Sequence, residues 1–119
     1  MTWKNTWNRF WDKYMKNTAG KVDNSIFSAD ETRRYRIVFS GNVQGVGFRY
    51  ETWSIAQKLQ LAGFVENLPN GKVYAEIQGP KNKILYLIDV LKSIPRVDIE
   101  DIEIDELETK NEIDFKIAN

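Results

Sequence analysis

Residues 34–60, RYRIVFSGNVQGVGFRYETWSIAQKLQ, contain the change of pattern that decides the fold. Tyr35, Ile37 and Phe39 occupy every second position at the start, which predicts a strand. Residues 49–60 instead space their apolar side chains by three and four, which predicts a helix. The buried face of that helix would comprise Phe48, Thr52, Ile55, Ala56 and Leu59. A glycine-rich loop joins the two elements.

The segment after this helix predicts a β-hairpin and a second helix. GFVENL, residues 63–68, is a short strand pattern, and PNG, residues 69–71, is a strong turn signal before the strand pattern KVYAEIQ, residues 72–78. Residues 81–93 return to the helical spacing, and Pro95 ends the helix because proline has no N–H to donate. The apolar face of this helix would comprise Ile84, Leu87, Ile88, Leu91 and Ile94.

Two strand patterns follow, at about residues 97–105 and 112–117. In the first one, Val97 and Ile99 are out of phase with Ile102 and Ile104, which predicts a bulge or a kink between them. The alternating residues of the second one are Ile113, Phe115 and Ile117. The order strand, helix, strand, strand, helix, strand, with one terminal strand added, predicts an α+β fold. This order is that of a ferredoxin-like βαββαβ sandwich, in which two helices cover one face of an antiparallel sheet.

The composition excludes several kinds of chemistry. The chain has 119 residues with no cysteine and no histidine, so it has no disulfide, Cys/His zinc site, thiolate nucleophile or Ser–His relay. The composition thus excludes the sites that require histidine or cysteine, and we expect no cofactor. Lys and Arg number 17, as do Asp and Glu, so no basic excess points to a nucleic acid. The lack of cysteine, and of any apolar run near the roughly 20 residues of a membrane span, predicts a cytoplasmic protein.

The length suits one globular domain with a short extension in front of it. Aromatic residues recur at steps of three and four within residues 1–17, which predicts an amphipathic helix; they are Trp3, Trp7, Phe10, Trp11 and Tyr14. We therefore divide the chain into an extension with its linker, residues 1–33, and a domain, residues 34–119. The helix could bind a partner, a second copy or a membrane surface, or could pack on the domain itself, and the pattern leaves these alternatives open.

The glycine loop lies where a strand is expected to end and a helix to begin. Gly41, Gly45 and Gly47 are costly to order, because glycine loses more conformational entropy on folding than any other residue. One explanation is a tight turn. Another is an anion site, because a helix N-terminus presents unpaired N–H groups that glycines can turn inward, and Arg49 adds donors suited to phosphate. The spacing fits neither a Walker loop nor a dinucleotide fingerprint.

Two motifs resemble those of the acylphosphatase family. GNVQGVGFR, residues 41–49, is similar to the family signature of Gly, any residue and Val-Gln-Gly-Val, followed shortly by Phe-Arg. GFVENLPNGKV, residues 63–73, is similar to the second signature, and Gly79 stands where a further family glycine is expected. The resemblance covers about residues 34–117 and implies the same ferredoxin-like fold. Tyr50 replaces the proline usual in the acylphosphatase-like domains of hydrogenase-maturation carbamoyltransferases, which favours a free-standing enzyme.

The resemblance also implies an activity, the hydrolysis of acyl phosphates to a carboxylate and inorganic phosphate without a metal. It assigns the phosphoryl oxygens to Arg49 and the attacking water to Asn67, whose neutral carboxamide orients water but is a poor base. We therefore expect the substrate phosphate to take up the proton. The implied phosphate-binding loop comprises Val43, Gln44, Gly45, Val46, Gly47, Phe48 and Arg49. There are two departures from the family pattern, Phe39 for an aliphatic residue and Glu66 beside Asn67. Because Glu66 points to the opposite strand face, we expect it to tune the site mildly rather than abolish activity.

Two alternatives stay open beside this hypothesis. One is a catalytically idle phosphate-binding module that contacts a protein through residues 1–17. The other is an RNA-binding ferredoxin-like domain, because GVGFRY, residues 45–50, is faintly similar to the aromatic-glycine strand motif of such domains. The expected loop position and the zero net charge disfavour RNA. The acids of residues 98–105 are interpreted as a solvated strand face, since they lack the spacing of a calcium loop. The hydroxyl residues near the loop are interpreted as caps or packing residues: Ser40, Thr52 and Ser54.

Overall fold

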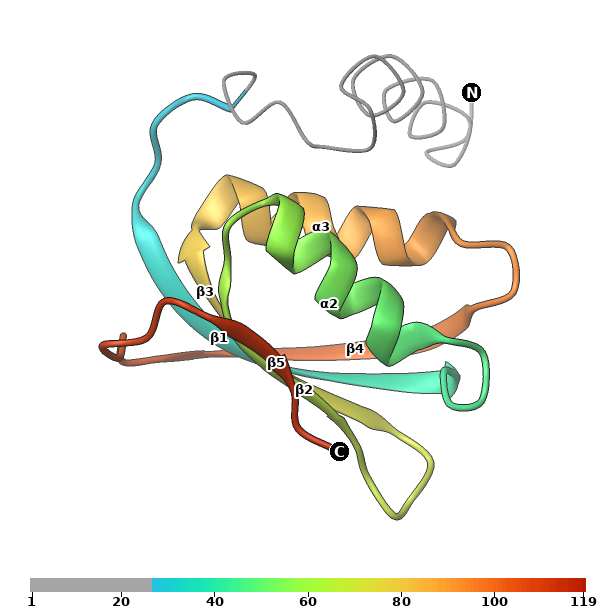
Figure 1. Cartoon of the computed structure of the whole chain (residues 1–119). Coiled ribbons are helices and arrows are strands. Elements are labelled where there is room, and N and C mark those ends of the chain that lie inside the picture. Colours follow the sequence, from blue (N-terminus) through green and yellow to red (C-terminus); the bar gives the residue numbers. More distant parts are fainter. Residues whose placement is uncertain (1–26) are drawn as a thin grey trace.

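The computed structural model of the protein describes residues 27–119. The predicted aromatic helix at residues 1–17 and most of the linker lie outside the described residues. The elements, in chain order, are β1 (Thr32–Asn42), α2 (Phe48–Lys58), β2 (Ala62–Asn67), β3 (Val73–Pro80), α3 (Lys81–Ser93), β4 (Asp98–Leu107) and β5 (Phe115–Ile117) (Figure 1). The predicted order of strands and helices is therefore confirmed.

One sheet contains all of these strands, in the order β4-β1-β3-β2-β5. The predicted antiparallel pairing holds for β1 with β3 and β4, and for β2 with β3. β5 pairs parallel to β2, so the sheet is mixed rather than wholly antiparallel. The parallel direction of β5 follows from the connection between β4 and β5, because these two strands lie at opposite edges of the sheet. The chain leaves β4, crosses the end of the sheet and returns along the far edge in the direction of β2.

The last strand is shorter than predicted. β5 begins at Phe115, and Ile113, which the alternation had placed with it, is 87% exposed. Residues 108–114 form the crossing instead, and the Glu112 carboxylate in it lies 2.9 Å from the buried guanidinium of Arg34. Arg34 points to the sheet face opposite the helices, since the alternate positions of β1, Tyr35, Ile37 and Phe39, pack into the core. This ion pair holds the crossing against the open face and leaves Ile113 in solvent.

The predicted irregularity after Ile99 is confirmed as a β-bulge. Ser40 pairs with Asp101, whereas the next residue, Gly41, pairs with Ile99, so Glu100 has no partner in β1. An extra residue of this kind bends the strand and increases its twist. The bend lies at the end of β1 that leads directly into the glycine loop.

Both helices cover the same face of the sheet (Figure 1). Phe48, the first residue of α2, packs edge-on against Phe39 of β1, with ring centroids 4.9 Å apart. This contact fixes the start of α2 over the end of β1, and thereby holds the loop between them. Ile94, also predicted for the apolar face of α3, is only partly buried. The predicted helix residues that are buried in the core are Phe48, Thr52, Ile55, Ala56, Leu59, Ile84, Leu87, Ile88 and Leu91.

The described part of the predicted linker contacts α3. The carboxylate of Asp30 accepts a hydrogen bond of 2.9 Å from the backbone N–H of Asn82, in the first turn of that helix. The N–H groups of a first turn have no partner within their helix, so Asp30 satisfies one of them from outside. The ring of Phe27 packs edge-on against Tyr86 at 5.0 Å. Residues 27–30 therefore fold as part of the domain.

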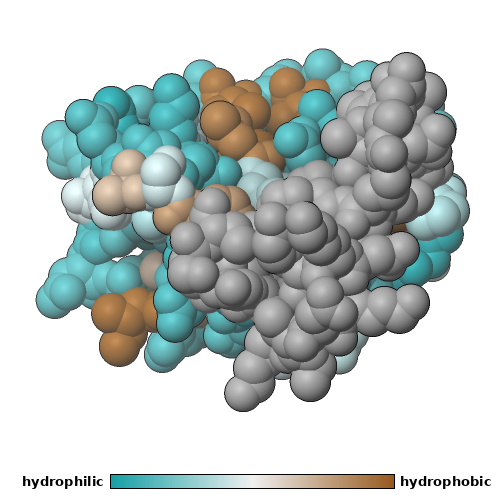
Figure 2. Space-filling view, turned by 90° about the horizontal axis from the view of Figure 1, so that it is seen from above, coloured by the Kyte–Doolittle hydropathy of each residue, from teal (hydrophilic) through white to brown (hydrophobic). Residues whose placement is uncertain are grey.

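The helical side of the molecule shows a mainly hydrophilic surface, on which hydrophobic side chains gather in a few places (Figure 2). No helix within residues 27–119 is long and apolar enough to cross a membrane. The exposed large hydrophobic side chains of the described region are Tyr50, Leu85, Ile104, Ile113 and Ile117. Tyr50 and Ile117 lie beside the pocket described next.

Candidate active site

The glycine loop and the first turn of α2 contain a run of backbone N–H donors without partners in residues 27–119. Gly45 and Gly47 have φ angles of 74° and 78°, in the left-handed region that favours glycine. Gly47 is the N-cap of α2 and provides no side chain to satisfy the first N–H groups. No acceptor in residues 27–119 receives the backbone N–H groups of residues 45–50. These groups are therefore available to an anion, and the helix dipole favours negative charge at the same place.

An arginine behind the loop fixes its orientation. Nε of Arg96, in the connection between α3 and β4, donates a hydrogen bond of 2.6 Å to the carbonyl oxygen of Val46. Its Nη2 forms an ion pair of 2.6 Å with Glu51 of α2. In a planar trans peptide the C=O and the next N–H point in opposite directions. Because Arg96 holds the Val46 carbonyl, the N–H of Gly47 faces away from Arg96.

Gln44 ties the loop to the hairpin between β2 and β3. Its Nε2 donates to the carbonyl oxygens of Leu68 and Lys72, at 2.8 and 2.9 Å. The side chain thus uses both of its donors on a second segment of backbone. This link brings the loop to the end of β2, where Asn67 is the last residue of the strand.

A pocket of about 220 Å³ lies between the loop, the start of α2 and the end of β2. Its lining comprises Val43, Gly45, Gly47, Phe48, Arg49, Tyr50, Asn67, Ile117 and Asn119. The structure thus brings Arg49 and Asn67 to one pocket, together with most of the predicted loop. Gln44 and Val46 are outside this lining, because Gln44 binds the hairpin and Val46 packs against the core. A larger hollow of about 530 Å³ lies along Asp98–Ile102, where the acidic side chains repel phosphate.

Asn67 carries a buried polar atom aimed at no protein partner. Its side-chain Oδ1 is buried and accepts no hydrogen bond within the described part of the chain. A buried acceptor in that condition costs on the order of 1–3 kcal/mol, a cost that a bound water removes. Glu66 pairs with Tyr74 in the sheet, and the pleat directs its side chain to the opposite face from Asn67, as expected.

The sequence analysis missed two residues that contact the site, Arg96 and Asn119. Asn119 accepts a hydrogen bond of 3.1 Å from Nη1 of Arg49 and one of 3.0 Å from the backbone N–H of Asn67. Neither residue belongs to a motif or to a periodic pattern, so no local signal marks them. The parallel pairing of β5 with β2 is what brings Asn119 to the pocket.

No three His, Cys, Asp or Glu side chains within residues 27–119 are grouped so that they could hold a metal ion. The donors that the pocket does offer are backbone N–H groups, one guanidinium and carboxamides, which are suited to anions rather than cations.

Comparison with known proteins shows the family of the chain. The family model described as Acylphosphatase matches residues 35–117. The chain belongs to the acylphosphatase family. An acylphosphatase of Methanothrix thermoacetophila is 41% identical over 83 residues, which are 69% of this chain and 92% of that protein. An acylphosphatase of Archaeoglobus fulgidus is 39% identical over 83 residues, 69% of this chain and 93% of that protein.

Solved structures share the fold. The crystal structure of acylphosphatase from Bacillus subtilis superposes with a TM-score of 0.69 at 35% identity, covering 73% of this chain and 99% of that one. A full-length HypF in the phosphate- and nucleotide-bound form superposes with a TM-score of 0.66 at 33% identity. That match covers 77% of this chain but only 12% of HypF, so the likeness is to one small part of the larger protein.

Proposed function

We propose that this acylphosphatase-family protein hydrolyses acyl phosphates, which are carboxyl–phosphate mixed anhydrides, to a carboxylate and inorganic phosphate. The observation that carries the proposal is the convergence of unpaired backbone N–H groups, from residues 45–50, with Arg49 and Asn67 at one pocket. The curated relatives described above are named acylphosphatases, which supports the same reaction here.

The phosphoryl group would be bound by the loop and by Arg49. Its oxygens accept hydrogen bonds from the N–H groups of residues 45–50, at the positive end of the α2 dipole. The Arg49 guanidinium, at the first turn of α2, adds charge-assisted hydrogen bonds. These donors are already in place, so they stabilise the charge that spreads over the phosphoryl oxygens in the transition state.

The attacking water would be oriented by Asn67. The water oxygen forms a bond to phosphorus as the bond from phosphorus to the acyl oxygen breaks, and the carboxylate leaves with that electron pair. One water proton passes to a phosphoryl oxygen, so no strong base is needed. A carboxylate is a good leaving group, so positioning and charge stabilisation are sufficient for this reaction.

The direct test is hydrolysis of benzoyl phosphate by the purified chain. We expect turnover by the wild type, and a loss of kcat/KM on the order of a hundredfold or more in Arg49→Ala and in Asn67→Ala. The matched controls are Arg33→Ala, which removes an arginine paired with Glu106 away from the pocket, and Asn111→Ala in the crossing. Both controls should keep wild-type activity.

Two results would contradict the proposal. If the wild type binds inorganic phosphate but does not hydrolyse benzoyl phosphate, the chain is the idle phosphate-binding module considered above. If Arg49→Ala and Asn67→Ala hydrolyse it at the wild-type rate, any activity arises elsewhere.

We also propose that residues 1–33 form an extension and linker of which the catalytic domain does not need residues 1–26, and that residues 1–17 mediate self-association or partner contact. Deletion of residues 1–26, which stops before β1, should leave kcat unchanged and alter the elution volume on size-exclusion chromatography. We predict a cytoplasmic location from the lack of cysteine. Fractionation of cells that express the protein would test this.

A further inference from the structure

Asn119 contacts both residues of the proposed chemistry. Its Oδ1 accepts hydrogen bonds from Nη1 of Arg49, at 3.1 Å, and from the backbone N–H of Asn67, at 3.0 Å. Its Nδ2 donates to the backbone carbonyl oxygen of Asn67 at 2.9 Å. A single carboxamide thus joins a guanidinium on α2 to the end of β2.

The two hydrogen bonds with the Asn67 backbone determine the orientation of the Asn119 carboxamide. Its nitrogen must face the carbonyl and its oxygen must face the N–H, since only that orientation satisfies both. The oxygen is then presented to Arg49, whose remaining donors are left for phosphoryl oxygens. A long arginine side chain has much rotamer freedom, and a fixed acceptor restricts it before any substrate is bound.

Backbone contacts fix the strand that carries Asn119. β5 has only 3 residues, and a strand of that length depends on its neighbours for stability. The N–H of Ala118 donates to the carbonyl oxygen of Val65 in β2 at 2.9 Å. Nε2 of Gln57, on α2, donates to the carbonyl oxygen of Phe115 at 3.2 Å. β5 is therefore held by both elements that form the pocket.

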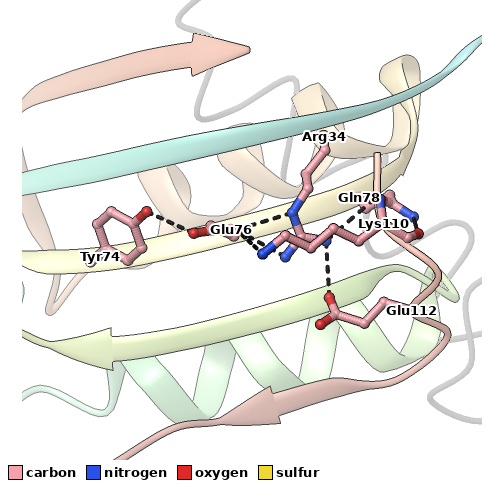
Figure 3. Close-up of polar contacts among 6 residues, drawn as sticks. All are labelled: Arg34, Tyr74, Glu76, Gln78, Lys110 and Glu112. Carbon is pink, nitrogen blue, oxygen red and sulfur yellow. Dashed lines mark hydrogen bonds and ion pairs between the residues drawn. The ribbon is translucent and has the colours of Figure 1, made fainter. Parts of the chain in front are cut away.

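A polar cluster on the open sheet face anchors the crossing that precedes β5 (Figure 3). Gln78 and Lys110 exchange two hydrogen bonds of 2.8 Å, from Nε2 to the backbone oxygen and from the backbone N–H to Oε1. The fully buried Arg34 donates from Nη1 to Glu112 at 2.9 Å. With the crossing fixed and β5 paired, the tertiary fold determines the position of residue 119.

We infer that Asn119 is a positioning residue for the hydrolysis proposed above, and that it holds the Arg49 guanidinium beside Asn67 before the substrate binds. The inference rests on the proposed function and adds to it a residue that belongs to neither sequence motif. Hydrogen-bond donors that are already in position lower the activation barrier of the hydrolysis, because the guanidinium does not have to be ordered when the phosphate binds.

The neutrality of the carboxamide is part of this role. An Asn119→Asp substitution keeps an acceptor for Arg49 but loses the donor to the Asn67 carbonyl, and it places a negative charge beside the pocket. That charge neutralises Arg49 and repels phosphate. Asn119→Ala removes the contacts without adding charge. A role limited to stability would leave the inhibition constant of phosphate unchanged in Asn119→Ala.

The experiment measures kcat and KM for benzoyl phosphate, the inhibition constant of inorganic phosphate, and urea unfolding for Asn119→Ala and Asn119→Asp. Asn111→Ala, an exposed asparagine in the crossing, is the control. We expect the inhibition constant to rise about five- to tenfold in Asn119→Ala and further in Asn119→Asp, with the control unchanged. In the background of Arg49→Ala, Asn119→Ala should have no further effect on this constant, because the two residues act together.

Three results would overturn the inference: kinetics of Asn119→Ala within twofold of the wild type, equal effects of the alanine and aspartate variants, or additive effects of Asn119→Ala and Arg49→Ala. The failure of the proposed function gives a different result, because then either the wild type does not hydrolyse benzoyl phosphate or Arg49→Ala retains full activity. Urea unfolding, read on the same preparations, identifies variants that are folded when assayed.

Discussion

The guanidinium of Arg34 is fully buried on the open face of the sheet, and its Nη2 lies 2.9 Å from Oε1 of Glu76. Two opposite charges at this depth have lost much of their hydration, so each depends on the other. The same guanidinium binds Glu112 in the crossing, which couples the centre of the sheet to the C-terminal strand. The pair therefore affects the stability of the domain and the arrangement of its pocket.

We predict that Arg34→Met lowers the free energy of unfolding by about 3 kcal/mol, because the Glu76 carboxylate, only 13% exposed, loses its buried ion-pair partner and keeps only Tyr74 and the more distant Lys110. The double variant Arg34→Met, Glu76→Met should recover most of that loss, since it removes both charges. Urea unfolding at neutral pH measures both. A single variant within about 1 kcal/mol of the wild type would contradict the prediction.

Glu76 also predicts a dependence of stability on pH. Burial acts to raise the pKa of its carboxyl, but hydrogen bonds from Tyr74 and Arg34, with the charges of Arg34 and Lys110, outweigh burial and hold that pKa below its ordinary 4.5. A lowered pKa means that the folded state favours the ionised form. The stabilisation is complete above about pH 4.5 and is lost as the pH falls through the lowered value.

The measurement is urea unfolding of the wild type and of Glu76→Gln between neutral pH and about pH 3. The variant should be less stable at neutral pH, and its stability should fall less steeply below the ordinary pKa of the carboxyl. If the free energy of unfolding fell equally with pH in the two proteins, Glu76 would not be the cause of the loss of stability in acid.

Arg96→Ala should loosen the loop without touching the substrate. With the Val46 carbonyl released, the N–H of Gly47 is no longer fixed toward the pocket. We expect the inhibition constant of phosphate to rise about fivefold, with a smaller change in the free energy of unfolding because Arg96 is half-exposed. Lys92→Ala, which removes a positive charge from the last turn of α3, is the control. An equal effect of the control would assign the change to overall charge.

Gln44→Glu should destabilise the protein at neutral pH, because a carboxylate would face the carbonyl oxygens of Leu68 and Lys72. We expect a loss of about 2 kcal/mol in the free energy of unfolding. Burial beside two acceptors raises the pKa of the introduced carboxyl, so part of the loss should be regained as the pH falls and the group is protonated. Gln60→Glu, at an exposed position, should show neither effect.

The elements that sequence predicts well are those whose evidence is local. The second helix was expected at residues 81–93 and is found as Lys81–Ser93, because its periodicity and the following Pro95 lie within one segment. The bulge near Ile99 was visible for the same reason. For Arg49 and Asn67, the motifs predicted the positions, and the fold brings both to one pocket.

The features that sequence misses depend on partners distant in the chain. Arg96 and Val46 are 50 positions apart. Ile113 follows the alternation of a strand, yet a contact of Glu112 with the distant Arg34 removes it from the sheet. Asn119 carries no pattern at all, and its role depends on an edge strand that pairs in parallel.

The crossing and the parallel edge strand β5 affect how a folding chain acquires its enzymatic activity. Arg49 and Asn119 are 70 positions apart, and Asn67 and Asn119 are 52 apart, so the pocket is completed by contacts of high sequence separation. Closing such loops is slow compared with forming a hairpin or a helix. The pairing of β1 with β4 spans as much of the chain, with Arg34 opposite Leu107, so the sheet and the pocket both depend on slow, long-range contacts. Enzyme activity, followed in time, would report the docking of the final strand more directly than any spectroscopic signal of the sheet.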